Sequence, residues 1–416
     1  MIDNIKHAKA AVYNASGAKF EMNGGWLMRS AEAGKSPSDN GGNSYYVLEN
    51  KGIAFISAGT ISYDRDYSQH NYSSLIENGW ADPAQNISGL DAVMTITGGY
   101  FNGGLNTVKN DDYGVMAIEG GVFEGAFNRI VLNWNVLSIS GGEFKNAPIM
   151  IDNDSAEETS IGQLTITGGE FAGEIYIYNT DSANISDATI IGNGSGTGIY
   201  IENASVTLKG GTISGFSIGV FVGSRSNATV SDFKAEGVTF SNISSKGIYG
   251  EAIGVLEVTG CTFTNAGTVG DDGMEVTARS ASAIDVNQLK AGTRITITDN
   301  KFVQCGDPNG STSGAIKVKV RNTVADDEEN ELANDGDVTD IAAGFKGSFD
   351  EGVTISGNTF EDTQSAADIV IGTAGNDGKP NTYTDNFEFA QENNVKTVAG
   401  EAAEIVIVNN AAEVIA

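Results

Sequence analysis

Two adjacent carboxylates are the side chains of this sequence best placed for acid–base chemistry. Asp271 and Asp272 lie between two glycines in the segment Gly270-Asp271-Asp272-Gly273. Nearby carboxylates can act as general acid and general base, because their mutual repulsion separates their pKa values. An Asp-Asp pair is more often part of a solvated acidic turn. We therefore assign no catalytic residue and keep Asp271 and Asp272 only as candidates for acid–base chemistry.

A longer acidic segment has the residue types that bind calcium. The candidate ligands are Asp326, Asp327, Glu328, Asp335 and Asp337. Calcium prefers clustered oxygen ligands, but the spacing here does not match an EF-hand loop. A run of charge is usually a solvated loop. We expect no cofactor, with calcium as the one ion that this segment could hold.

Aromatic residues in a polar, loop-rich segment have the chemistry of a sugar-binding platform. Tyr63, Tyr67, Tyr72 and Trp80 occur close together there. Aromatic faces stack on sugar rings, and exposed loop tyrosines are suited to recognition. The alternative is that the rings pack this loop against the rest of the fold. The sequence leaves both interpretations open.

The composition restricts the classes of function. The chain has 416 residues, of which 24 are basic and 54 acidic, and its net charge is −30. Such a surface repels phosphate, which argues against nucleic-acid binding and against anionic membranes. The two histidines and two cysteines are too few and too dispersed for a zinc site. We expect Cys261 and Cys305 to be small buried hydrophobes, with a disulfide between them as the alternative.

One short unit recurs along most of the chain. Its first clear copy is Thr95-Ile96-Thr97-Gly98-Gly99-Tyr100-Phe101. Further copies end at Phe123, Phe144, Phe171 and Ile213, and weaker ones at Phe263, Phe302 and Phe360. The alternation of apolar and polar residues has the period of a β-strand. The Gly-Gly pair permits a tight corner.

Strands closed by asparagine alternate with this unit. They end at Asn50, Asn78, Asn110, Asn133, Asn153, Asn179 and Asn203. Asparagine tolerates the left-handed backbone region better than most residues, so we expect a left-handed turn residue at this corner. Stacked asparagines can also hydrogen-bond to one another along a ladder.

Short strands with tight corners and almost no helix signal predict a solenoid. We expect an all-β, single-stranded parallel β-helix of about 13–14 coils, stacked at the strand spacing of a sheet. Residues 44–375 would form this helix, with long loops at 264–294 and 303–352. Residues 1–43 and 376–416 would form capping or attachment segments.

These repeats resemble the right-handed parallel β-helix of the pectin-lyase-like superfamily. The Thr-Ile-Thr-Gly-Gly-x-Phe units and the asparagine-closed strands are more narrowly similar to glycine-rich repeats of surface proteins from gut anaerobes and to β-helical proteins of phage particles. The resemblance covers residues 44–375. It implies the fold but no single function, because lyases, hydrolases, adhesins and inert spikes share that fold.

The resemblance also argues against two enzymatic branches of the superfamily. The polygalacturonase branch combines a Gly-Asp-Asp motif, as at 270–272, with Gly-His-Gly and Arg-Ile-Lys motifs, but no histidine follows His70 here. The lyase branch needs a basic cleft that neutralises uronates. Basic residues of this chain are isolated, as are Arg129, Arg225, Arg279 and Arg321.

We therefore expect a non-enzymatic structural or adhesive surface protein. We favour a phage virion component, such as a capsid decoration, fibre or tail protein, that binds glycans at the virion surface. Residues 1–9 show no apolar leader, which favours a virion over a bacterial wall. The alternatives are a tailspike-type glycosidase that degrades polysaccharides and a bacterial cell-surface adhesin. The expected partners are other virion proteins, surface glycans and further copies of the chain.

Overall fold

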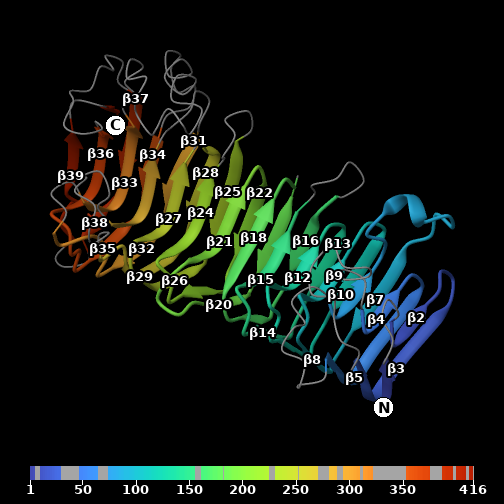
Figure 1. The fold of residues 1–416 in the computed structure, drawn as a ribbon. Helices are drawn as coiled ribbons and strands as arrows, with labels where there is room; N and C mark the ends of the chain where they lie inside the picture. The colour runs from blue at the N-terminus through green and yellow to red at the C-terminus, as the bar shows by residue number, and fades with distance from the viewer. Residues whose placement is uncertain are drawn as a thin grey trace, which may run out of the picture. The chain divides into compact units, whose positions relative to one another are not determined.

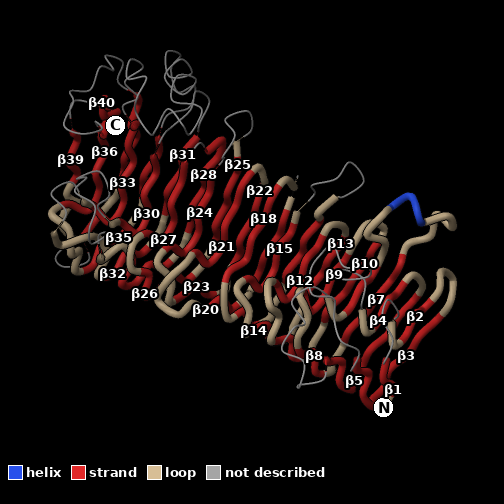
Figure 2. Tube along the Cα trace, in the orientation of Figure 1, coloured by secondary structure: helices blue, strands red, loops and turns tan. Residues whose placement is uncertain are grey.

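The structure of the chain is a computed structural model. It describes residues 1–4, 10–29, 46–63, 74–154, 161–180, 182–223, 230–251, 253–269, 281–287, 294–309, 313–321, 353–374, 387–396, 400–408 and 412–415. The chain divides into two compact units, residues 1–190 and residues 191–416. Short parallel β-strands make up most of the described chain (Figure 1), and the short 3₁₀ helix η1 (Pro83–Gln85) is drawn in blue in Figure 2.

The first unit is built from coils that each place one strand in a parallel sheet, here called sheet 1. Its strands pair in sequence order, so each coil lies on the preceding one. They are β2 (Val12–Asn14), β4 (Leu48–Asn50), β6 (Ile76–Asn78), β9 (Asn106–Asn110), β12 (Arg129–Asn133), β15 (Ile149–Asn153) and β18 (Glu174–Tyr178).

The remaining strands of the first unit form a second parallel sheet, here called sheet 2. Most coils contribute two short strands to it, separated by a corner. They are β1 (Ile2–Asn4), β3 (Lys19–Arg29), β5 (Ile53–Tyr63), β7 (Ala92–Ile96), β8 (Tyr100–Asn102), β10 (Gly114–Ile118), β11 (Val122–Glu124), β13 (Val136–Ile139), β14 (Glu143–Lys145), β16 (Gln163–Ile166), β17 (Glu170–Phe171), β19 (Ala183–Ser186) and β20 (Thr189–Ile191).

The second unit repeats this three-strand coil. Its sheet 1 strands are β21 (Thr197–Glu202), β24 (Ile218–Gly223), β27 (Lys246–Glu251), β30 (Ser282–Asn287), β33 (Gly314–Arg321), β36 (Ala367–Ala374) and β39 (Ile405–Val408). Its sheet 2 strands are β22 (Ser205–Lys209), β23 (Thr212–Ser214), β25 (Ser231–Glu236), β26 (Thr239–Ile243), β28 (Ile253–Thr259), β29 (Thr262–Ala266), β31 (Arg294–Thr298), β32 (Lys301–Val303), β34 (Val353–Ser356), β35 (Thr359–Glu361), β37 (Phe387–Glu392), β38 (Val395–Lys396) and β40 (Ala412–Ile415). Sheet 1 has 14 described strands, of which 12 lie within residues 44–375 and two, β2 and β39, lie in the predicted terminal segments.

The repeated phenylalanines form the core of each unit. In the first unit, adjacent rings have centroids 4.5–5.0 Å apart and planes within 11° of parallel, along Phe101, Phe123, Phe144 and Phe171. In the second unit the corresponding distances are 4.7–5.1 Å, along Phe240, Phe263, Phe302 and Phe360. These rings are buried. Burying each one contributes about 2–3 kcal/mol, and each stacked pair adds about 0.5–1.5 kcal/mol.

The second glycine of each Gly-Gly pair makes room for this ladder. Gly121 has φ 112°, a region that other residues rarely adopt. A Cβ atom there would lie 3.3 Å from the Phe101 ring and 3.4 Å from the Phe123 ring. Both the backbone conformation and the space beside the rings therefore favour glycine at this corner.

A ladder of buried asparagines lies at another corner of the first unit. Each Nδ2 donates to the Oδ1 of the next asparagine at 2.6–2.8 Å, along Asn14, Asn50, Asn78, Asn110, Asn133 and Asn153. The amides also donate to backbone carbonyls, as Asn110 does to Val136 at 2.9 Å. The predicted ladder is therefore present, and it satisfies polar groups that would otherwise be buried without partners.

The expected left-handed conformation is wrong for these ladder asparagines, none of which has a positive φ. Their side chains are buried and hydrogen-bond inside the coil, so the backbone stays in the strand region. The expectation holds for Asn179 (φ 49°) and Asn203 (φ 51°), which are turn residues.

The predicted terminal segments contribute coils wherever they are described. Strand β2 pairs with β4 and β3 with β5 at one end, and β39 pairs with β36 at the other. The predicted long loops likewise contain β30 and β33, which are sheet 1 strands. A capping or attachment role for 1–43 and 376–416 stays a prediction.

Candidate functional site

Most of the residues predicted from the sequence to do chemistry lie outside the described residues. This is so for Asp271, Asp272, Asp326, Asp327, Glu328, Asp335, Asp337, Tyr67 and Tyr72. Within the ranges that are described, no group of three or more His, Cys, Asp or Glu side chains is arranged to hold a metal ion. Arg129, one of the isolated basic residues, forms an ion pair with the buried carboxylate of Asp152.

Tyr63 and Trp80, the two described members of the predicted sugar platform, are buried. Tyr63 is 5% exposed and donates its hydroxyl to the Ser74 carbonyl at 2.8 Å. The Arg29 guanidinium lies 5.1 Å from the centroid of its ring. Trp80 is 6% exposed and packs edge-on to Tyr113. Neither ring presents an open face to solvent, so we place the candidate glycan contact elsewhere.

A largely buried cluster of charged side chains lies at the ends of β4, β6 and β9, where Lys51 Nζ is 5.6 Å from the centroid of the Trp80 ring. Lys51 Nζ lies 2.5 Å from Glu77 Oε2 and 3.4 Å from Glu49 Oε1. Lys109 Nζ lies 3.1 Å from Asp111 Oδ1. Burial raises the pKa of Asp111 to about 7, an effect that Lys109 opposes and Glu77 adds to. Glu77 and Asp111 are almost fully inaccessible, so we do not take this cluster as the candidate binding site.

The Asp111 carboxyl makes stability depend on pH. Between about pH 4 and pH 7 the folded unit holds a proton that the unfolded chain has lost, so this contribution is complete below the unfolded pKa and disappears as pH rises through 7. We expect the free energy of unfolding to fall by on the order of 2–3 kcal/mol between pH 5 and pH 8 from this group. Urea denaturation at each pH measures it.

Asp111→Asn is the matched variant, because it keeps the shape of the side chain and removes its titration. Glu49, Glu77, Lys51, Lys109 and Tyr46 still face the site in the variant, as do all other titrating groups of the chain. A pH slope in Asp111→Asn as steep as in the wild type would show that another group is responsible.

The two cysteines are free and buried, as we expected from the sequence in preference to a disulfide. Burial raises the pKa of Cys261 to about 11 and that of Cys305 to about 12. Because the thiolate is the reactive form, we expect no reaction with a disulfide reagent at pH 8 in the native protein. Both thiols should react once guanidinium unfolds the chain. Rapid labelling of either thiol under native conditions would contradict this burial.

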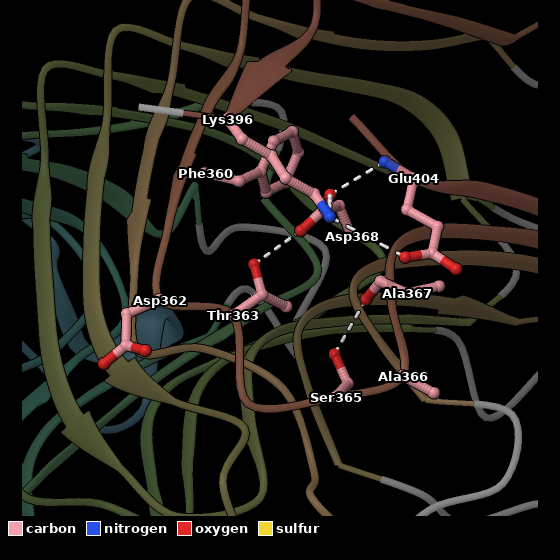
Figure 3. Close-up of a pocket in the computed structure, with 9 residues that line it drawn as sticks. All are labelled: Phe360, Asp362, Thr363, Ser365, Ala366, Ala367, Asp368, Lys396 and Glu404. Atoms are coloured by element: carbon pink, nitrogen blue, oxygen red, sulfur yellow. Dashed lines mark hydrogen bonds and ion pairs between the residues drawn. The ribbon is translucent and has the colours of Figure 1, made fainter. Parts of the chain in front are cut away.

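A pocket of about 240 Å³ in the second unit is the candidate functional site (Figure 3). It is formed by the turn after β35, the start of β36, the end of β38 and the residue before β39. Its lining combines charged, hydroxyl and small apolar side chains, from Phe360, Asp362, Thr363, Ser365, Ala366, Ala367, Asp368, Lys396 and Glu404.

Asp368 organises this pocket. Its side chain is buried, with Oδ1 accepting from Thr363 Oγ1 at 2.6 Å and Oδ2 accepting from the Glu404 backbone N–H at 2.8 Å. Lys396 Nζ lies 3.6 Å from Asp368 Oδ2 and 3.7 Å from Glu404 Oε2. Both carboxylate oxygens of Asp368 are thus engaged in holding the turn, which is unlike a nucleophile or a proton donor awaiting substrate.

Sequence reasoning missed this pocket. Asp368 interrupts an otherwise apolar strand, Ala367-Asp368-Ile369-Val370, and a charge in such a strand was a usable signal. Lys396 and Glu404 lie in other coils, and only the stacking of coils brings them to Asp368.

The comparisons with known proteins support the fold. Residues 147–307 match a family model described as a right handed beta helix region. Together with the stacked parallel strands, this match confirms the predicted right-handed parallel β-helix. No curated protein and no solved structure matches the chain. In the described part of the chain, no helix is long and apolar enough to cross a membrane.

Proposed function

We propose that this chain is a non-enzymatic structural and adhesive protein of a phage virion surface, acting as a capsid decoration, fibre or tail protein that contacts glycans. Its fold is one that tailspikes, adhesins and other surface proteins share. The observation that carries the proposal is the continuity of the ladders. Within each unit, core rings and buried amides repeat from coil to coil, which is the construction of a rigid scaffold.

The candidate pocket supports adhesion in preference to catalysis. Its buried carboxylate is fully hydrogen-bonded, and its exposed carboxylates, Asp362 and Glu404, lie on loops at the surface. A glycosidase needs two carboxylates placed on opposite sides of a scissile bond, one of them poised to donate a proton. The pocket instead offers polar groups around a small volume, which is the chemistry of recognition.

Density-gradient fractionation of the native source tests the virion assignment. Mass spectrometry of the fractions should find the chain with intact particles, at a copy number that matches a capsid or tail symmetry. Recovery of the chain with cell envelopes, or free in the medium, would overturn the virion assignment and favour the bacterial adhesin.

A further inference from the structure

We propose that the pocket between β35 and β36 binds a single neutral pyranose residue of a surface glycan, through two adjacent hydroxyl groups. This inference rests on the proposed adhesive function and names the ligand class of its site. Four properties of the pocket carry it: its size, its solvent-exposed hydrogen-bonding groups, its charge and its apolar wall.

The size of the pocket fits one sugar ring. Its volume is about 240 Å³, whereas pockets for larger organic ligands start at about 300 Å³. A longer glycan would therefore place one residue in the pocket and leave its neighbours in solvent.

Lys396 and Glu404 supply hydrogen-bonding groups of opposite kind. The Lys396 ammonium is 3.6–3.7 Å from its carboxylate neighbours, which is beyond the usual N–H···O distance. It is also 35% exposed, so its donors can reach a ligand. The Glu404 carboxylate is 55% exposed and accepts hydrogen bonds only. Figure 3 shows both side chains next to Asp368.

A hydroxyl group both donates and accepts, so adjacent sugar hydroxyls complement such a pair. One hydroxyl would accept from Lys396 Nζ while its neighbour donates to Glu404. An uncharged diol satisfies both groups at once, whereas a single anion or a single cation satisfies only one of them.

The charge of the lining selects against anionic sugars. Asp362, Asp368 and Glu404 outnumber Lys396, and the whole chain carries a net charge of −30. A uronate or sialate would bring a fourth carboxylate into this field. The ammonium group of an amino sugar would compete with Lys396 for the carboxylates of Asp368 and Glu404, which Lys396 already approaches. Neutral hexoses avoid both penalties.

The remaining wall is apolar and suits the C–H face of a sugar. Ala366 is an exposed apolar residue of the lining, whereas Ala367 and Phe360 are only 3% and 1% exposed. Thr363 and Ser365 use their hydroxyls to donate to Asp368 and to the Ala367 carbonyl. These bonds hold the wall in place before any ligand arrives, which lowers the ordering cost of binding.

Isothermal titration of the full chain with methyl glycosides tests the inference. The probes are neutral hexosides, a glucuronide and a glucosaminide at the same ionic strength. We expect at least one neutral hexoside to bind, and the two charged sugars to bind at least tenfold more weakly. Preference for the glucuronide would overturn the inference.

Variants of the two polar groups sharpen the test. Lys396→Met and Glu404→Gln should each weaken hexoside binding about tenfold or more. Lys209→Met is the matched control, because Lys209 forms an exposed ion pair with Glu236 and does not line the pocket. Equal loss in Lys209→Met, or no loss in Lys396→Met, would overturn the assignment. Unchanged melting temperatures would show that all variants are folded.

The outcomes separate this inference from the proposed function. Glycan binding that survives both pocket variants would leave adhesion standing and refute this site. Absence of any glycan binding, in a chain that travels with particles, would refute adhesion and the site together and leave the structural role.

Discussion

Replacing Asn110 by alanine is expected to destabilise the first unit by about 3–5 kcal/mol. Asn110 is fully buried. Its Nδ2 donates to Gly114, Asn133 and Val136, and its Oδ1 accepts from Asn78. Alanine removes all four bonds and leaves buried donors and acceptors of the neighbouring coils without partners. Each such group costs about 1–3 kcal/mol.

Urea denaturation followed by tryptophan fluorescence measures this effect in the relevant unit. All three tryptophans, Trp26, Trp80 and Trp134, lie within residues 1–190. Asn184→Ala is the matched control, because Asn184 is an exposed residue of β19. Its cost should stay within about 0.5 kcal/mol. Comparable losses in both variants would mean that the ladder adds nothing beyond an ordinary asparagine.

The second large effect is expected from Phe123→Ala. The Phe123 ring is fully buried between Phe101 and Phe144, with centroids 4.5 and 5.0 Å away. Truncation removes buried apolar surface, opens a cavity and breaks two stacked pairs. The cost should be about 3–5 kcal/mol. Phe123→Leu should cost less, because leucine refills part of the volume.

Phe127→Ala is the control for this prediction. Phe127 is 63% exposed, so its truncation should change the free energy of unfolding by about 0.5 kcal/mol or less. The same fluorescence transition reports both variants. A Phe123→Ala protein as stable as the wild type would show that the stack is not what holds these coils together.

The ladders were predictable because they depend on what each coil repeats. Phe101, Phe123 and Phe144 occupy the same place in three copies of one unit, and parallel register then stacks them. The same holds for Asn110, Asn133 and Asn153. A repeated residue in a stacked coil must meet its own copy, so sequence periodicity alone indicates the contact.

Asn179 shows where this reasoning fails. It continues the asparagine series in the sequence, but β18 pairs with β15 in a register that places Ile177 opposite Asn153. Asn179 therefore lies beyond the ladder, at a turn, and donates to Asp154. The spacing of the asparagines in the sequence does not reveal whether a given asparagine ends a strand or lies in the turn that follows.

The candidate pocket was less predictable for a different reason. Lys396 and Glu404 do not belong to the repeated unit. Their approach to Asp368 depends on the geometry of the turns next to their strands. Turn geometry varies between coils, whereas strand register is shared. Function in such a fold is accordingly carried by the residues that the repeat does not predict.

The asparagine and phenylalanine ladders also determine how a gene for this protein can change in length. Residues 111–133 supply one Gly-Gly pair, one core ring at Phe123 and one ladder amide at Asn133. In-frame duplication or loss of that segment would leave both ladders continuous, since each coil meets only its neighbours. A single-codon insertion within a strand would instead turn its buried side chains outward. We therefore expect this protein to tolerate changes in length that add or remove whole coils.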